Sequence, residues 1–253
     1  MSPRTRSLVI LAACLCAALG FARLGIWQLR RLAEGRALNR PAGAARALPV
    51  VSLDDPVDAA SLVRTGADNR RLRVTGRYDH AAEIFIREQS EAGVPGVRVV
   101  TPLRPLRGDT AILVQRGYVA SPDGRPLRLS ALEEPGVREV EGIAFVQPDS
   151  GVAGEPVEQA GQLTWRRLDL EAVRQRLPYP IHQFLLLQLP DTALPALPAR
   201  DLPPELSDGP HLVYAILWFA FALAVVLAGS SVWLRRPGRA GALRQKQSGR
   251  ARR

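Results

Sequence analysis

Residues 212–234 read LVYAILWFAFALAVVLAGSSVWL, a run of 23 residues without a charged side chain. As an α-helix this run would be about 34 Å long, which exceeds the roughly 30 Å hydrocarbon core of a bilayer. The tail that follows, residues 235–253, has seven arginines, one lysine and no acidic residue. A buried helix of a soluble protein is the alternative, but the length and the basic tail favour a transmembrane helix.

A second apolar segment, residues 7–29, lies near the N-terminus. Its only charge is Arg23, placed near the far end, where a long side chain can reach the lipid headgroups. Trp27 follows at the depth where aromatic rings favour the bilayer interface. We expect a transmembrane helix here. A cleaved signal peptide is the alternative, and the residues before Cys14 resemble a lipoprotein processing site.

The charges are distributed unevenly along the chain. Residues 1–46 have eight arginines and one acidic residue, whereas residues 47–210 have 18 arginines and 23 acidic residues. The basic surplus therefore lies beside the apolar segments, as in membrane topology signals, and not on the middle domain, where a nucleic-acid binder would have it. We expect residues 1–6 and 235–253 to be cytoplasmic and residues 30–211 to be extracytoplasmic.

The middle domain is predicted to be α+β, mostly antiparallel strands with one main helix. Residues 97–103 and 111–119 are β-branched runs separated by Gly108-Asp109, which is typical of a hairpin. Residues 165–177 have helical spacing, with Asp169 as a possible cap. Both cysteines lie in the first apolar segment, so no disulfide is expected in the domain. Further strands are expected at 71–76, 83–86, 137–146 and 181–189, and Pro-rich irregular leads at 41–63 and 190–210.

The sequence has no phosphate-binding glycine loop, nucleophile elbow or paired-histidine zinc motif, so we do not expect an enzyme. A membrane-anchored hydrolase built from scattered carboxylates remains the alternative. His211, Tyr214 and Trp218 have helical spacing on one face of the second apolar helix. Packing of the two helices would bring this face near Trp27, Gln28, Arg30 and Arg31. An aromatic belt is the simple interpretation. A haem site is the other, because imidazole ligates iron, rings pack on a macrocycle and arginines pair with propionates.

Several motifs, in order, resemble the Surfeit locus protein 1 family, bacterial type. They are Gly25-Ile26-Trp27-Gln28-Leu29-Arg30-Arg31, Gly76-Arg77-Tyr78-Asp79, Val99-Val100-Thr101-Pro102-Leu103, Leu113-Val114-Gln115-Arg116-Gly117-Tyr118-Val119, Asp169-Leu170-Glu171-Ala172 and His211-Leu212 with Tyr214, Trp218 and Phe219. The chain departs from the family pattern at Gln115, at Gly209-Pro210 and at Leu217.

The resemblance implies an assembly factor for haem-copper cytochrome c oxidase in the bacterial inner membrane. It implies a chaperone that binds haem a and assists its insertion into the largest oxidase subunit, with that subunit and the haem a synthesis machinery as partners. By the same resemblance His211 is the candidate iron ligand, surrounded by Trp27, Gln28, Arg31, Tyr214 and Trp218. The alternative is a membrane-anchored scaffold that carries no cofactor and grips an oxidase subunit through Arg116, Gly117 and Tyr118.

Overall fold

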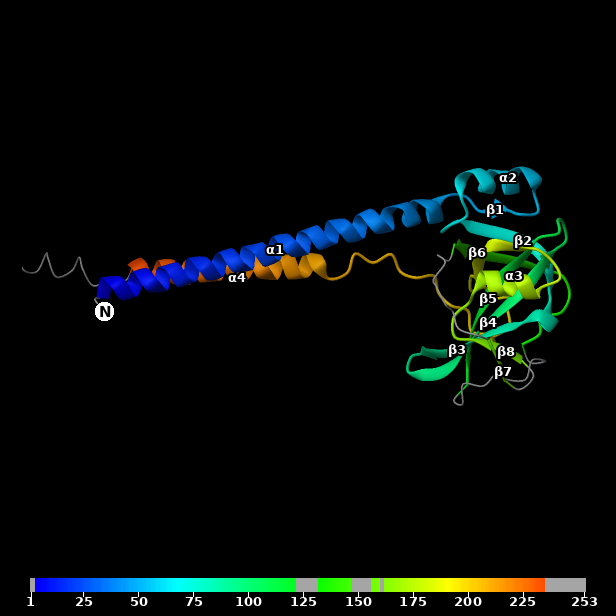
Figure 1. Ribbon diagram of the computed structural model, residues 1–253. Helices are drawn as coiled ribbons and strands as arrows, with labels where there is room; N and C mark the ends of the chain where they lie inside the picture. Colours follow the sequence, from blue (N-terminus) through cyan, green and yellow to red (C-terminus); the bar gives the residue numbers. More distant parts are fainter. Residues whose placement is uncertain (1–2, 122–131, 147–155, 160–161, 235–253) are drawn as a thin grey trace, which may run out of the picture. The chain divides into compact units, whose positions relative to one another are not determined.

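A computed structural model describes residues 3–121, 132–146, 156–159 and 162–234 (Figure 1). The chain divides into two units. Residues 1–39 and 207–253 form one unit, here named the helical hairpin, and residues 40–206 form the other, here named the strand domain. The expected basic tail at 235–253 lies outside the described residues.

The strand domain contains a closed barrel. Its five strands, in spatial order, are β2 (Arg71–Tyr78), β6 (Arg138–Phe145), β9 (Ile181–Gln188), β5 (Ala111–Ala120) and β4 (Val94–Pro105), and β4 pairs again with β2. The closing contact begins where Gly76 faces Pro105. A Cβ atom at position 76 would lie 2.4 Å from the carbonyl oxygen of Arg104, so only glycine lets the two strands approach this closely.

Four further strands extend the sheet beyond the barrel. The strand β1 (Val51–Ser52) pairs with β2, while β3 (Ile84–Glu91), β8 (Gln162–Trp165) and β7 (Val157–Gln159) continue outward from β4. Most pairs are antiparallel, as predicted, but β1–β2, β3–β8 and β5–β9 are parallel. The predicted hairpin of β4 and β5 is confirmed, with Leu103 opposite Ile112 and Gly108 in the left-handed region at φ 87°.

Alternation along the strands gives the barrel an inner and an outer apolar face. On β9, Phe184 and Leu186 point into the barrel, where they pack with residues such as Val74. Leu185 points outward and packs under the helix α3 (Leu170–Arg176), together with Trp165. The chain therefore buries both faces of the same strand, which explains the nearly continuous apolar run at 181–189.

The helices of the strand domain differ from the expectation. The expected main helix at 165–177 is shorter, because Trp165 ends strand β8 and the helix begins only after Asp169, which accepts a hydrogen bond from the amide of Ala172 as predicted. A second helix, α2 (Pro56–Thr65), lies in the expected irregular lead. Asp55 caps it and Pro56 occupies its first turn, where proline starts a helix instead of breaking it.

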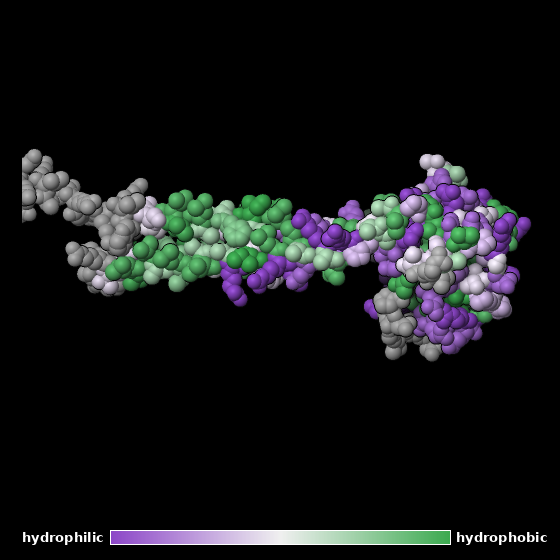
Figure 2. All heavy atoms as spheres, turned by 90° about the horizontal axis from the view of Figure 1, so that it is seen from above, coloured by the Kyte–Doolittle hydropathy of each residue, from purple (hydrophilic) through white to green (hydrophobic). Residues whose placement is uncertain are grey.

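The helical hairpin consists of α1 (Pro3–Ala47), up to Asn39, and α4 (His211–Leu234). Both helices are long and apolar enough to cross a membrane. In the view of Figure 2, hydrophobic side chains cover most of their paired length, and hydrophilic side chains gather toward the end at which α4 begins. They lie antiparallel: a Cβ atom on Gly25 would lie 2.8 Å from the ring of Phe219, and one on Gly229 would lie 3.0 Å from Cys14.

Helix α1 does not end at residue 29 but continues through Pro41 to Ala47. A proline inside a helix removes one backbone hydrogen bond and is costly. Tertiary contacts within the strand domain fix this last part of the helix. Arg46 donates to the side-chain oxygen of Asn69 at 2.9 Å and to the carbonyl oxygen of Pro204 at 2.7 Å, and its guanidinium lies over the ring of Phe145.

Candidate functional site

The candidate site of the helical hairpin is centred on His211, the first residue of α4. Its Nδ1 atom lies 2.8 Å from Oε1 of Gln28 on α1. Because an amide oxygen can only accept, Nδ1 carries the proton and donates it to Gln28. The other ring nitrogen, Nε2, is then unprotonated in the neutral imidazole and is able to bind a metal ion.

Gly209, two residues before His211, lies close to that nitrogen. Gly209 has a φ of 66°, in the left-handed region that favours glycine. A Cβ atom at position 209 would lie 3.4 Å from Nε2, so a side chain there would crowd the free nitrogen. Pro210 follows, and its carbonyl oxygen accepts the first helical hydrogen bond, from the amide of Tyr214 at 3.2 Å. The departure at Gly209-Pro210 from the family pattern thus places no side chain of residue 209 against the half-buried imidazole at the helix start.

Aromatic side chains of α1 and α4 near His211 and Gln28 lie in two different environments. Trp218 stacks on Phe21 with ring centroids 5.7 Å apart, and Phe221 packs against both rings. Trp27 and Tyr214, in contrast, are 51% and 47% exposed. The structure therefore engages Trp218 in the packing of the two helices, while Trp27 and Tyr214 are accessible to a flat apolar ligand.

Basic side chains of α1 lie beyond Gln28. Arg31 forms an exposed ion pair with Glu34, at 3.0 Å within its own helix. Arg36 pairs with Asp208 at 2.8 Å, and Asn39 donates to the carbonyl oxygen of Ser207 at 3.0 Å. The last two contacts tie α1 to the residues that lead into α4. Among these polar side chains, Arg31 is the one predicted as a site residue, and it is exposed.

The segment Arg116-Gly117-Tyr118 was expected to bind a partner in the scaffold alternative. It lies inside strand β5, in agreement with the strand predicted at 111–119. Arg116 is fully buried, Tyr118 is 6% exposed, and a Cβ atom on Gly117 would lie 2.1 Å from the carbonyl oxygen of Ala199. A partner protein cannot reach these side chains in this conformation. Whether the surrounding surface binds a partner stays a prediction.

Arg116 is the centre of a buried ion network. Its guanidinium donates to Glu83 at 2.9 Å and to Glu134 at 2.8 Å, and Arg200 also donates to Glu134 at 2.5 Å. Burial alone would raise the pKa of the Glu134 carboxyl, but the hydrogen bonds and charges of Arg116 and Arg200 outweigh burial and lower that pKa. The network joins the strand β5 to the segment around Arg200, so its role is structural.

Sequence reasoning missed several residues of these arrangements. Phe21, Gly25 and Phe219 contribute to the contact between α1 and α4. Gly25 and Phe219 lay in recognised motifs, but nothing in the sequence marked them as contact residues, and Phe21 lay in no motif. Glu83 and Glu134 are separated from Arg116 by 33 and 18 positions, so no local pattern marks them as partners. In the parts of the chain that the structure describes, no three His, Cys, Asp or Glu side chains are grouped to hold a metal ion.

Comparison with known proteins places the chain among relatives. Residues 15–223 match the SURF1 family. A SURF1-like protein of Rickettsia felis is 24% identical over 213 residues, which cover 81% of this chain and 88% of that protein. Surfeit locus protein 1 of Takifugu rubripes is 29% identical over 168 residues, or 60% and 68% of the two chains. A SURF1-like protein of Monosiga brevicollis is 28% identical over 229 residues, or 85% and 83%.

The resemblance of the sequence motifs is therefore confirmed. The match extends over most of the chain, from the helix that contains Gln28 through the barrel to the helix that contains His211. The protein belongs to the SURF1 family.

Proposed function

We propose that this protein is a membrane-anchored assembly factor of a haem-copper cytochrome c oxidase, and that it binds haem a through His211. Members of the SURF1 family are generally known as oxidase assembly factors and not as enzymes. The partners in this proposal are the largest oxidase subunit and the machinery that makes haem a. The observation that carries the haem site is the hydrogen bond between His211 and Gln28.

Membrane anchoring is supported by the surface of the helical hairpin. Large apolar side chains are exposed along both helices, among them Leu19 at 69% and Leu227 at 60%. A continuous apolar surface of this kind is unfavourable in water and favourable in lipid. The positive charges at 4, 6 and 235–253 favour cytoplasmic termini, which would place the strand domain outside the cytoplasm.

An axial haem ligand needs a neutral imidazole with one oriented nitrogen. Histidines that bind metals usually donate the second ring N–H to an oxygen, which fixes the tautomer and the direction of the ring. Gln28 provides such an oxygen to Nδ1, and the glycine at position 209 places no side chain against Nε2. The residues present therefore fit a haem iron ligand. Iron held there would supply coordination without a reaction, as suits a carrier that passes its haem on.

The surroundings of His211 fit the rest of the haem. The exposed rings of Trp27 and Tyr214 can pack on the macrocycle, and a guanidinium such as that of Arg31 pairs well with propionate. Because Arg31 already pairs with Glu34 at the surface, exchange of this partner for a propionate costs little. Trp218 would act indirectly, by holding α4 against Phe21.

The test is co-expression of the full chain with the haem a synthesis enzymes, followed by purification and measurement of the haem a absorption band per protein. We expect a haem band in the wild type and its loss in His211→Ala. His182→Ala is the matched control, because His182 lies on β9 of the strand domain. An equal band in His211→Ala and wild type would place the ligand elsewhere, and the absence of haem from both would favour the scaffold alternative.

A further inference from the structure

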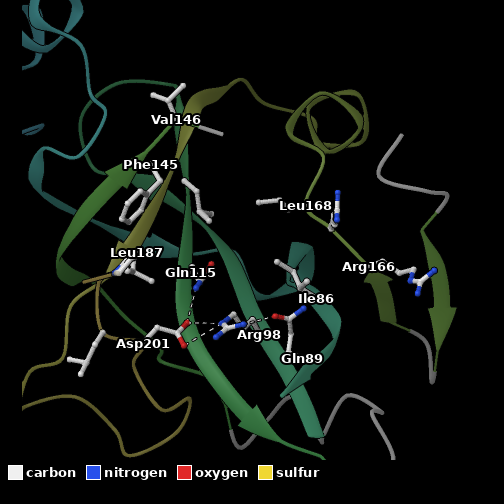
Figure 3. Close-up of a pocket in the computed structure, with 14 residues that line it drawn as sticks. Ile86, Gln89, Arg98, Gln115, Phe145, Val146, Arg166, Leu168, Leu187 and Asp201 are labelled. Atoms are coloured by element: carbon white, nitrogen blue, oxygen red, sulfur yellow. Dashed lines mark hydrogen bonds and ion pairs between the residues drawn. The ribbon is translucent and has the colours of Figure 1, made fainter. Parts of the chain in front are cut away.

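A hollow of about 690 Å³ lies in the strand domain, within the size range of about 300–1,000 Å³ typical of small-ligand sites (Figure 3). On one side it is bounded by residues 166–168, which lead into α3. On the other side lies a segment here named the strap, residues 198–206, which is bridged to β5 between Tyr118 and Ala199. The hollow is thus the part of the outer sheet face that neither α3 nor the strap covers.

The floor of the hollow is apolar. Leu185 and its neighbour on the same face, Leu187, are each 4% exposed, and Phe145 lies opposite Leu185 on the adjacent strand. Figure 3 shows Phe145 and Leu187 on one side and Leu168 and Ile86 on the other. Five strands, β6, β9, β5, β4 and β3, and the loop before α3 therefore contribute to one continuous trough.

The strap turns one charged residue toward this trough. Asp201 accepts hydrogen bonds from Nε of Arg98 at 3.1 Å and from the side-chain amide of Gln115 at 2.6 Å, and Arg98 also donates to Gln89. The carboxylate of Asp201 is only 10% exposed and is satisfied by these donors. It is therefore neutralised, and it holds the strap in place beside the trough.

The rim is positively charged. Arg98, Arg166 and Arg167 line the hollow, against the single carboxylate of Asp201. Arg166 pairs with Glu88 at 2.6 Å, whereas Arg167 is exposed and forms no ion pair with any residue that the structure describes. The rim also includes a solvent-exposed apolar side chain, that of Leu202 in the strap, which is 77% exposed.

We infer that the hollow binds a single-chain anionic amphiphile such as a fatty acid, with its alkyl chain on the floor and its carboxylate at Arg167. An alkyl chain needs no hydrogen bonds, which suits a floor of Leu185, Leu187 and Phe145. A guanidinium without an ion pair favours an anionic head group. This site is independent of the haem proposal, because it lies wholly within the strand domain.

The strand pairing argues against an extended peptide as the occupant. Peptides usually bind a sheet by adding a strand to a free edge. The floor strand β9 has no free edge, because it is paired with β5 on one side and with β6 on the other. The trough consequently offers side chains and few main-chain groups, and a hydrocarbon chain uses such a surface better than a peptide does.

The test uses the full-length protein in lipid nanodiscs, which avoids detergent. The probe is decanoic acid with a photoreactive diazirine, and the comparison probe is the corresponding decylamine. After illumination, labelled peptides are mapped by mass spectrometry. We expect decanoate to label peptides of β9 and of the strap, and excess unlabelled decanoate to abolish this labelling. Decylamine should label them about fivefold less, since its charge has the wrong sign for the rim.

Exposed residues provide variants that do not threaten the fold. Arg167→Glu and Leu202→Asp should each reduce labelling of β9 several-fold. The matched controls Arg107→Glu and Leu106→Asp, on the exposed connection between β4 and β5, should leave it unchanged. Labelling confined to α1 and α4, equal labelling by both probes, or unchanged labelling in Arg167→Glu and Leu202→Asp would overturn the inference.

Discussion

The Nδ1 atom of His211 lies 2.8 Å from Oε1 of Gln28, although the two residues are 183 positions apart in the sequence. The contact joins the start of α4 to the middle of α1 and sets which nitrogen of the imidazole is free. The proposed role of His211 depends on this geometry, so Gln28 is a positioning residue whose own loss has a measurable consequence.

Replacement of Gln28 by alanine should weaken haem a binding by about 10- to 100-fold, the usual effect of losing an orienting partner of a metal-binding histidine. Gln28→Glu should retain binding, because a carboxylate also accepts from Nδ1. The measurement is the haem a content of the purified variants. Asn39→Ala is the control, since Asn39 is an amide of the same helix that contacts Ser207 and not His211. Equal haem content in Gln28→Ala and Asn39→Ala would contradict the positioning role.

The antiparallel pairing of α1 and α4 predicts a specific disulfide. In Gly229→Cys, the new Cβ atom would lie about 3.0 Å from Cβ of Cys14, so a small shift brings the pair to disulfide distance. Mild oxidation should therefore link residues 14 and 229, seen as a cross-linked peptide without reductant. The link should survive Cys16→Ser and disappear in Cys14→Ser. Linkage through Cys16 would show that the helices meet in another register.

Gly25 permits the close contact of the two helices near the candidate site. In Gly25→Ala the added Cβ atom would collide with the ring of Phe219, so the helices must separate at this level. When Gly25→Ala is combined with Gly229→Cys, we expect slower formation of the 14–229 disulfide. We also expect a lower haem a content in Gly25→Ala. Phe219→Ala in the same chain should restore both. Gly20→Ala is the matched control, because no atom lies within 4 Å of a Cβ there. Identical behaviour of the two alanine variants would refute this packing.

The buried network around Arg116 should dominate the stability of the strand domain. Arg116→Met leaves the buried Glu83 without its arginine and Glu134 with Arg200 alone, which should lower the free energy of unfolding by about 3–5 kcal/mol. Arg174→Met, which breaks an exposed pair with Glu171, should cost about 0–1 kcal/mol. Hydrogen exchange of the β5 amides reports the difference. A similar small effect of both substitutions would mean that the network is not formed.

The same network predicts sensitivity to acid. Because the pKa of Glu134 is lower in the folded protein than its ordinary value of 4.5, its contribution to stability is complete above about pH 4.5. That contribution is lost as the pH falls through the folded-state pKa. The stability difference between wild type and Glu134→Gln, measured by exchange of the β5 amides, should therefore shrink below pH 4.5. A constant difference between pH 7 and pH 3 would contradict the lowered pKa.

Local patterns predicted much of this fold. The alternating and β-branched runs gave β2, β4, β5, β6 and β9 within a few residues, since each strand buries at least one face. The closure of the barrel could not be foreseen, because the pairing of Gly76 with Pro105 is a tertiary contact. The helices were less predictable. Pro41 indicated that the first helix ends before it, but tertiary contacts keep this part of the chain helical. Pro56 indicated an irregular segment, but with Asp55 as the cap it starts helix α2.

The candidate site was predictable only in outline. Helical spacing placed His211, Tyr214 and Trp218 on one face, and the motif around Trp27 placed Gln28 at a similar depth. The partner of each side chain was not predictable, since it depends on how α1 and α4 are rotated. In the structure, His211 forms a hydrogen bond with Gln28, whereas Trp218 stacks on Phe21. For Arg116 the sequence indicated the strand but not the buried carboxylate partners, because these are distant in the chain.

The most direct test of the haem proposal is a titration of haem a into the haem-free, full-length protein, followed by absorption spectroscopy, for wild type, His211→Ala and His182→Ala. We predict that wild type and His182→Ala bind with the same affinity and the same spectrum, and that His211→Ala binds at least about tenfold more weakly with an altered spectrum. An unchanged affinity and spectrum in His211→Ala would contradict a role for His211 as the iron ligand.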